Sequence, residues 1–178
     1  MKNIVSQATI ISNLQTAKNT FVTFCDLIDE KDFFLQPPQK WSIAQHIHHL
    51  TVSTRLTLLA YRLPKFVVKL YGGKPNRPSN DYNTLVEKYK QKLLAGGKAS
   101  GVFIPKPIPT TNTKQKTVAA FHKKMDALIL TIQKKWHDEE LDQYIIPHPL
   151  LGKITLRELG FFTIYHTYHH LEIIKQRL

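Results

Sequence analysis

Apolar residues recur at helical spacing in four long stretches of this chain. Within each stretch they fall along one side of a helix with about 3.6 residues per turn, which predicts four amphipathic helices. We expect these helices at residues 3–31, 42–63, 113–137 and 155–177. Four such helices are typical of an all-α four-helix bundle, with their apolar faces turned to a shared core.

Local signals mark where the second and fourth helices begin. Ser42 followed by Gln45, and Thr155 followed by Glu158, are capping boxes, in which each side chain hydrogen-bonds the backbone N–H at the other position. Adjacent prolines close the first helical stretch, because proline cannot continue a helix. Residues 145–154 are predicted to form a loop leading into the last helix.

A long connection joins the second and third helices. It covers residues 64–112, with short helices expected after Pro64 and from about 81 to 95. Residues 96–113 contain three prolines and are predicted to be extended. The connection is long enough to cross the whole bundle, and long loops in compact domains are often functional.

Length and composition fit one globular domain spanning residues 1–178. Of these residues 42% are hydrophobic, which suits a sizeable core. The single cysteine, Cys25, excludes an intramolecular disulfide and a cysteine-rich zinc site, and we expect it to be a small core residue. No run of 18 apolar residues and no signal-peptide pattern is present, so we expect a cytoplasmic protein without a membrane span.

Two histidines lie inside the apolar face of the last helix. On a helical wheel His166 and His170 fall in the middle of the apolar arc, one turn apart, whereas His169 falls at its edge and Glu158 and Glu172 project on the other side. An unpaired buried polar group costs roughly 1–3 kcal/mol, so the pair needs partners. A metal ion bound by both lone pairs would supply them, and hydrogen bonds to backbone or tyrosine are the alternative.

The second helix carries three more histidines. His46 and His49 both flank its core side, and the wheel does not separate them as ligands. His48 falls on the polar side and is expected to be solvated. The small residues Ser53 and Ala60 leave space beside His49, as the wall of a pocket would.

His122 lies on the predicted inner face of the third helix. We expect it to pack or to support a site rather than to be a ligand. Tyr61 and Tyr165 are candidate polar neighbours of the histidines, although tyrosines at such positions are more often packing residues.

Several short motifs together resemble the DinB/YfiT-like superfamily. They are Pro37-Pro38-Gln39-Lys40-Trp41-Ser42 with a histidine eight residues after the tryptophan, then His148-Pro149, Gly152, Thr155, Glu158 and the His166/His170 pair. The resemblance extends over essentially the whole chain. It implies a four-helix bundle with a long crossover between helices two and three, and a homodimer. It also implies a divalent metal ion held by three histidines, which by position are His49, His166 and His170.

The resemblance also bears on activity. Characterised members include thiol S-transferases that use bacillithiol and a mycothiol-dependent isomerase. Three neutral imidazoles leave open positions on a metal ion, where a water or thiol can be activated. Nitrogen ligands favour Zn²⁺ or Ni²⁺ over Fe²⁺ or Mn²⁺. We therefore expect a metal-dependent enzyme acting on a small molecule, of thiol S-transferase or hydrolase type; no general base is identifiable.

The distribution of charge supports an alternative. The net charge is +12, and residues 61–137 hold sixteen basic and three acidic residues, a net of +13. Such a field attracts anions, which include an anionic thiol substrate, an acidic partner and nucleic acid. A non-enzymatic basic binding protein with a structural or vestigial metal site is therefore the second hypothesis. Nucleic acid is the weaker partner, because the chain has no helix-turn-helix or aromatic-basic RNA motif.

Overall fold

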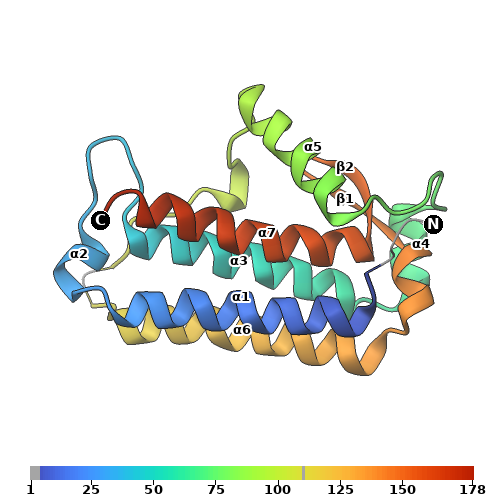
Figure 1. Cartoon of the computed structure of the whole chain (residues 1–178), viewed down its shortest axis with the longest axis horizontal. Helices are drawn as coiled ribbons and strands as arrows, with labels where there is room; N and C mark the ends of the chain where they lie inside the picture. Colours follow the sequence, from blue (N-terminus) through green and yellow to red (C-terminus); the bar gives the residue numbers. More distant parts are fainter. Residues whose placement is uncertain (1–4, 110) are drawn as a thin grey trace.

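Four long helices form the body of the molecule (Figure 1). The structure is a computed structural model that describes residues 5–109 and 111–178. The helices are α1 (Gln7–Asp26), α3 (Ile43–Arg62), α6 (Lys114–Lys135) and α7 (Leu156–Lys175). The predicted four-helix bundle is confirmed. No helix within the described residues is both long and apolar enough to span a membrane.

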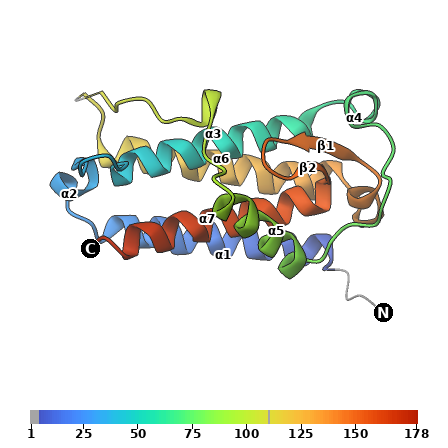
Figure 2. The same cartoon turned by 90° about the horizontal axis from the view of Figure 1, so that it is seen from above.

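The order of the helices around the bundle explains the long connection. α1 packs against α6 and α7, and α3 packs against the same two helices. α1 and α7 run in one direction, and α3 and α6 run in the other (Figures 1 and 2). Because α3 ends at the end of the bundle opposite to where α6 begins, residues 63–113 must return along its whole length. The predicted crossover between the second and third bundle helices is therefore confirmed.

The crossover builds a layer above α3 and α7. It contains α4 (Lys65–Gly72), α5 (Tyr82–Leu94) and the short 3₁₀ helix η1 (Gly101–Phe103). Figure 2 shows α5 lying over α7, against which it packs, while η1 contacts α3. Both short helices were predicted. The side chain of Asp81 caps α5 by accepting a hydrogen bond from the Thr84 N–H at 2.8 Å.

The first helix is shorter than predicted. α1 ends at Asp26, and a separate short helix, α2 (Glu30–Phe34), follows it. The ammonium group of Lys114 donates to the backbone oxygens of Asp26 and Ile28, and so satisfies carbonyls that a longer helix would have used. The break also lets Phe33 turn into the core, where it is fully buried. The expected contribution of Ile4 to this helix lies outside the described residues.

A β-hairpin, preceded by the short 3₁₀ helix η2 (Asp138–Asp142), replaces the loop predicted before the last helix. Strand β1 (Ile145–His148) pairs antiparallel with β2 (Gly152–Thr155). The hairpin rests on α4, where Gly72 comes so near the Ile145 carbonyl that a β-carbon would lie 1.7 Å from its oxygen. The pairing depends on this tertiary support, which a helical or alternating pattern does not reveal.

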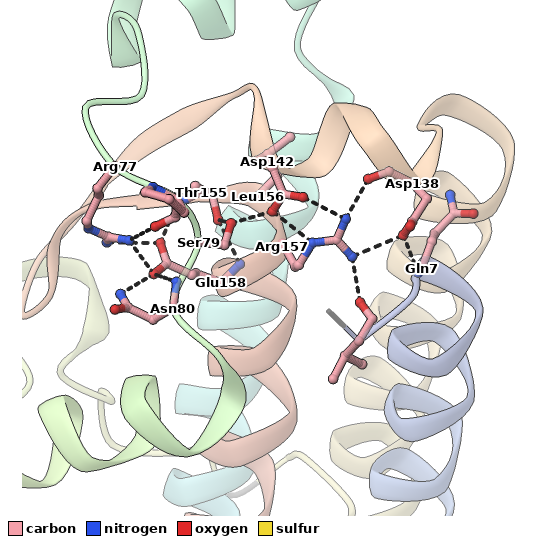
Figure 3. Close-up of polar contacts among 12 residues, drawn as sticks. Gln7, Arg77, Ser79, Asn80, Asp138, Asp142, Thr155, Leu156, Arg157 and Glu158 are labelled. Carbon is pink, nitrogen blue, oxygen red and sulfur yellow. Dashed lines mark hydrogen bonds and ion pairs between the residues drawn. The ribbon is translucent and has the colours of Figure 1, made fainter. Parts of the chain in front are cut away.

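Both predicted capping boxes are present, and the second is part of a larger polar network (Figure 3). Glu158 was predicted to project away from the core, but it is 0% exposed. Its carboxylate accepts hydrogen bonds from the Arg77 guanidinium at 2.8 and 3.1 Å, from the Asn80 N–H and side-chain amide, and from the Thr155 N–H. The crossover thus covers the first turn of α7 and buries its acidic residue.

A second part of the network fixes α7 to the start of α1. The Arg157 guanidinium, 2% exposed, binds the carboxylates of Asp138 and Asp142 and the backbone oxygen of Val5 (Figure 3). The Asp138 carboxylate also accepts from the backbone N–H of Gln7. The Asp138 carbonyl also accepts from this guanidinium, so two carboxylates and two carbonyls satisfy its five N–H donors, and this end of the bundle has a defined geometry.

Candidate metal centre

Three histidines from two helices meet inside the bundle. His49 on α3 and His166 and His170 on α7 are each 4–6% exposed. The Nε2 atom of His166 lies 3.1 Å from Nε2 of His49 and 3.1 Å from Nε2 of His170. Each ring offers one ligand atom, and the three atoms all lie within 4.8 Å of one another. The i,i+4 pair and the helix-two histidine predicted from the sequence are therefore neighbours.

Hydrogen bonds at the opposite ring nitrogens orient these histidines. His49 Nδ1 lies 2.7 Å from the Phe103 carbonyl oxygen. A carbonyl only accepts, so this nitrogen carries the proton and Nε2 keeps its lone pair. His170 Nδ1 lies 2.8 Å from His46 Nδ1, and His166 Nδ1 lies 3.5 Å from Ser53 Oγ. Each ring thus has a partner at Nδ1 and turns Nε2 to the common centre.

The spacing and the protonation pattern fit a divalent cation. Two nitrogen ligands of a tetrahedral zinc ion, at Zn–N distances of about 2.0–2.1 Å, are about 3.3 Å apart, close to the 3.1 Å found here. Without a cation the three Nε2 atoms would need protons among themselves. A proton on Nε2 of His166, the middle nitrogen, can form a good hydrogen bond to at most one neighbour, whereas a cation can bind all three lone pairs. The donor set, three imidazole nitrogens, suits zinc or nickel.

Burial keeps these imidazoles neutral, which is the form that binds metal. Burial and neighbouring histidines hold the pKa values of His166 and His170 well below the ordinary 6.5. Burial also lowers the pKa of His49, partly offset by its hydrogen bond to the Phe103 carbonyl. Burial, with Arg177 and nearby histidines adding to it, lowers the pKa of His46 to about 3. All four rings are therefore neutral at pH 7.

Trp41 covers the histidines at the end of the bundle near the C-terminus. Its ring centroid lies 5.3 Å from that of His46, 5.2 Å from that of His49 and 6.3 Å from that of His170. Its carbonyl oxygen accepts a hydrogen bond from the Arg177 guanidinium at 2.6 Å. The indole excludes water from one side of the centre.

The remaining candidate histidines take different places. His46, which the wheel could not separate from His49, lies behind His170, and its Nε2 is buried with no hydrogen-bond partner among the described residues. His169 is half-buried at the edge of the centre, in line with its place on the wheel. His48 was predicted to be solvated but is half-buried, and burial and Arg55 lower its pKa.

The prediction that His122 faces inward is wrong. Its side chain is 45% exposed and lies 3.1 Å from the carboxylate of Asp126, one turn along α6. The helix turns the neighbouring Met125 into the core instead. Tyr61 is a packing residue whose hydroxyl donates to the Leu156 carbonyl. Cys25 is a buried core residue, as predicted, and burial raises its pKa to about 12.

A cavity of about 480 Å³ opens beside the three histidines. Its walls come from α3, α4, α5, η1, the hairpin and α7, and most of the side chains are aliphatic or aromatic. No aspartate or glutamate is among the residues that line it within the described chain. Lys98 and His148 also line the cavity. The sequence predicted neither the hydrogen bond from His49 to the Phe103 carbonyl nor the position of His148 in the cavity wall. The crossover places Phe103 there, and the hairpin places His148.

Comparison with known proteins agrees with this fold. Residues 13–174 match the model of the DinB superfamily, and the chain therefore belongs to this superfamily. Its fold is similar to that of YfiT from Bacillus subtilis, with 14% sequence identity, a TM-score of 0.61, and coverage of 99% of this chain and 89% of that one. YfiT is described as a probable metal-dependent hydrolase with an unusual four-helix bundle topology. No curated protein matches the sequence.

Proposed function

We propose that this protein is a divalent-metal-dependent enzyme of hydrolase type that acts on a small molecule. In this proposal His49, His166 and His170 are the metal ligands. The observation that carries it is the convergence of their three buried Nε2 atoms beside a cavity large enough for a small-molecule substrate. The description of YfiT supports the same class of reaction for a bundle of this fold.

The chain would provide a dry, neutral, oriented site. A divalent cation held by three imidazoles retains open positions, acts as a Lewis acid and lowers the pKa of water toward 7. Phe103 and His46 hold the Nδ1 protons of His49 and His170, so that each Nε2 lone pair stays directed inward. Trp41 keeps bulk water from the centre.

A thiol S-transferase is the second candidate. No carboxylate of the described residues lines the cavity to act as a general base, and a thiol, with a pKa near 8.5, needs less help than water to ionise. Lys98 is exposed at the cavity and would attract an anionic thiol. Comparing thiol-dependent consumption of an electrophile with thiol-independent hydrolysis distinguishes the two reactions.

The contacts of several basic side chains argue against the alternative, a non-enzymatic basic binding protein. Lys114 and Lys135 bind carbonyl oxygens at the ends of α1 and α3, and Lys65 and Arg77 pair with carboxylates. These cations therefore stabilise helix ends, the half-buried Glu140 and the buried Glu158. A gel-retardation assay with duplex DNA at low and high salt tests the alternative. Retardation that weakens with salt would support nucleic-acid binding.

The ligand assignment is tested by replacing each histidine and measuring zinc. We expect His49→Ala, His166→Ala and His170→Ala to lose zinc affinity by more than the roughly 10- to 100-fold caused by losing a supporting hydrogen bond. Wild-type protein should melt higher with zinc, since saturation at 100 times Kd adds about 2.7 kcal/mol of stability. Elemental mass spectrometry and zinc titration provide the measurements.

His48→Ala and His169→Ala are the matched controls, since both remove a half-buried histidine next to a ligand in sequence. They should keep wild-type zinc content. If all three ligand variants also keep it, the metal lies elsewhere and the proposed enzyme loses its basis.

A further inference from the structure

The cavity beside the histidines has a selective chemical lining. Leu56, Leu93, Leu159 and Phe162 are among the apolar side chains that form its walls. Among the described residues that line it, Lys98 is the one residue that is a lysine, arginine, aspartate or glutamate. A cationic ligand would lose its hydration here and find no carboxylate in return, whereas an apolar ligand would gain from burial.

His148, one of the residues that line this cavity, carries a directional hydrogen-bond donor. Its Nδ1 accepts hydrogen bonds from the backbone N–H groups of Leu150 at 3.3 Å and Leu151 at 3.2 Å. Two donors at Nδ1 require its lone pair, so the neutral ring carries its proton on Nε2. Burial lowers the pKa of His148 to about 4, which keeps the ring neutral at pH 7. Nε2 has no hydrogen-bond partner within the described residues.

The position of His148 relates this donor to the three-histidine centre. Its ring centroid lies 4.3 Å from that of Phe162, and the Phe162 ring stacks on His166 with centroids 4.8 Å apart. One phenyl ring thus separates the N–H donor from a ring of the centre. His148 and the three histidines of the centre line the same cavity.

We propose that the cavity binds an apolar, non-cationic amide or ester, with its reacting group at the three-histidine centre and a second acceptor oxygen bound by His148 Nε2–H. This inference rests on the proposed function. The substrate class follows because no aspartate or glutamate is among the described residues that line the cavity. The specificity follows from His148, whose tautomer is fixed by the hairpin turn.

The substrate class is tested on the zinc-loaded protein with three hydroxamates, which bind zinc and resemble an amide. Isothermal titration calorimetry compares acetohydroxamate, 4-phenylbutanehydroxamate and the cationic 4-aminobutanehydroxamate. We expect the phenyl compound to bind about tenfold or more tighter than acetohydroxamate, because its ring is buried. The amino compound should gain nothing. Equal affinities for the three would overturn the substrate class.

The role of His148 is tested with phenylalkyl hydroxamates that carry a ketone at successive chain positions. At one position the ketone should strengthen binding to wild-type protein by roughly 2- to 10-fold, the range for one hydrogen bond. His148→Phe should abolish that gain while the ketone-free compound binds as before, and His148→Gln, which keeps an N–H donor, should retain part of it. A structural role alone would weaken both compounds together. If no position gains, or if the gain persists in His148→Phe, the assignment of the donor is wrong.

Two further readouts separate this inference from the proposed function. Nitrogen-15 NMR of the ring should show a protonated Nε2 and an unprotonated Nδ1 at His148; the opposite tautomer would overturn the inference. Metal analysis reports on the centre itself. If the protein binds no divalent metal at the centre, the proposed function and this inference fail together, whereas a bound metal with indiscriminate hydroxamate binding overturns this inference alone.

Discussion

At the scale of single residues, His46 has unusual surroundings. It is 4% exposed, its Nδ1 faces Nδ1 of His170 at 2.8 Å, and its Nε2 is buried without a partner among the described residues. If His170 directs its Nε2 lone pair to the centre, its Nδ1–H donates to His46. His46 then accepts at Nδ1 and carries its own proton on Nε2. Burying this Nε2–H without a partner is unfavourable. It leaves Nδ1 of His46 free to accept from His170 Nδ1–H, which fixes the tautomer of His170.

This arrangement predicts a supporting role for His46 in metal affinity. We expect His46→Phe to weaken zinc binding by about 10- to 100-fold, the usual effect of losing the hydrogen-bond partner of a ligand. His46→Asn, whose side-chain oxygen can accept in place of Nδ1, should recover part of the loss. Competition with a chelator of known affinity measures both.

His122→Ala serves as the control for removing a histidine, because that side chain lies on the surface beside Asp126. It should leave the affinity unchanged. Wild-type affinity in His46→Phe would mean that His170 is oriented by packing alone.

The same residues show what the sequence could predict about the site. The wheel placed His166 and His170 inward, because both lie on one helix and periodicity is local information. It placed His46 and His49 together and could not rank them. The structure separates them through partners far away in the chain, the Phe103 carbonyl for His49 and the His170 ring for His46. The prediction for His122 was wrong for a related reason, since a polar residue assigned to the inner face of a helix can pair at the surface instead.

At the scale of secondary-structure elements, the sequence predicted those helix ends that are capped by residues close in sequence. Ser42 and Thr155 were predicted to begin helices and do, because each capping box needs only neighbours in sequence. The end of α1 and the hairpin were not predicted. Lys114, which binds the carbonyls after α1, is remote in sequence, and β1 is supported by α4. Tertiary contacts decided these elements, and they override local propensity.

The start of α7 gives a prediction at this scale. Burial raises the pKa of Glu158, but hydrogen bonds from Arg77, Thr155 and Asn80 outweigh it, so the pKa is lowered and the carboxylate is charged. Arg77→Met removes the one cationic partner that Glu158 has among the residues described (Figure 3). We expect a loss of about 1–3 kcal/mol, because the remaining N–H donors only partly satisfy a buried carboxylate. Urea unfolding measures the free energy.

Lys74→Met is the matched control, since it removes the same charge from an exposed position in the same segment. It should change stability by less than about 0.5 kcal/mol. The double variant Arg77→Met/Glu158→Gln should be less destabilised than Arg77→Met, because the buried charge is gone. If Arg77→Met is as stable as the control, the ion pair contributes nothing measurable.

At the scale of the whole molecule, the crossover connects the fold to the site. Because α3 and α6 run in the same direction, the chain must return along the bundle, and the returning segment supplies Phe103, α4 and α5. The bundle alone provides the three histidines, whereas the crossover and the hairpin complete the walls of the cavity that α3 and α7 begin. The three histidines are thus carried by rigid helices, whereas part of the cavity wall comes from connecting segments, where sequence changes are more easily tolerated.

Buried neutral histidines also make the stability of the whole metal-free molecule depend on pH. Burial lowers the pKa of His46 to about 3 and of His148 to about 4, and it holds the pKa values of His166 and His170 well below 6.5. In the unfolded chain these histidines titrate near pH 6.5. Below that pH the unfolded state binds protons that the folded state does not, so stability falls as the pH falls.

We therefore expect metal-free protein to have nearly constant stability above pH 7 and to lose it steeply from about pH 6.5 down to the lowered pKa of His148, about 4. Each such histidine contributes a slope of up to about 1.4 kcal/mol per pH unit. Urea unfolding in the presence of a chelator, at pH 7.5, 6.0 and 5.0, measures the slope. His148→Phe removes one of these groups without touching the three-histidine centre and should flatten it by about one histidine's share. A free energy of unfolding that stays constant down to pH 5 would mean that the buried histidines take up protons in the folded state, against the burial found for them.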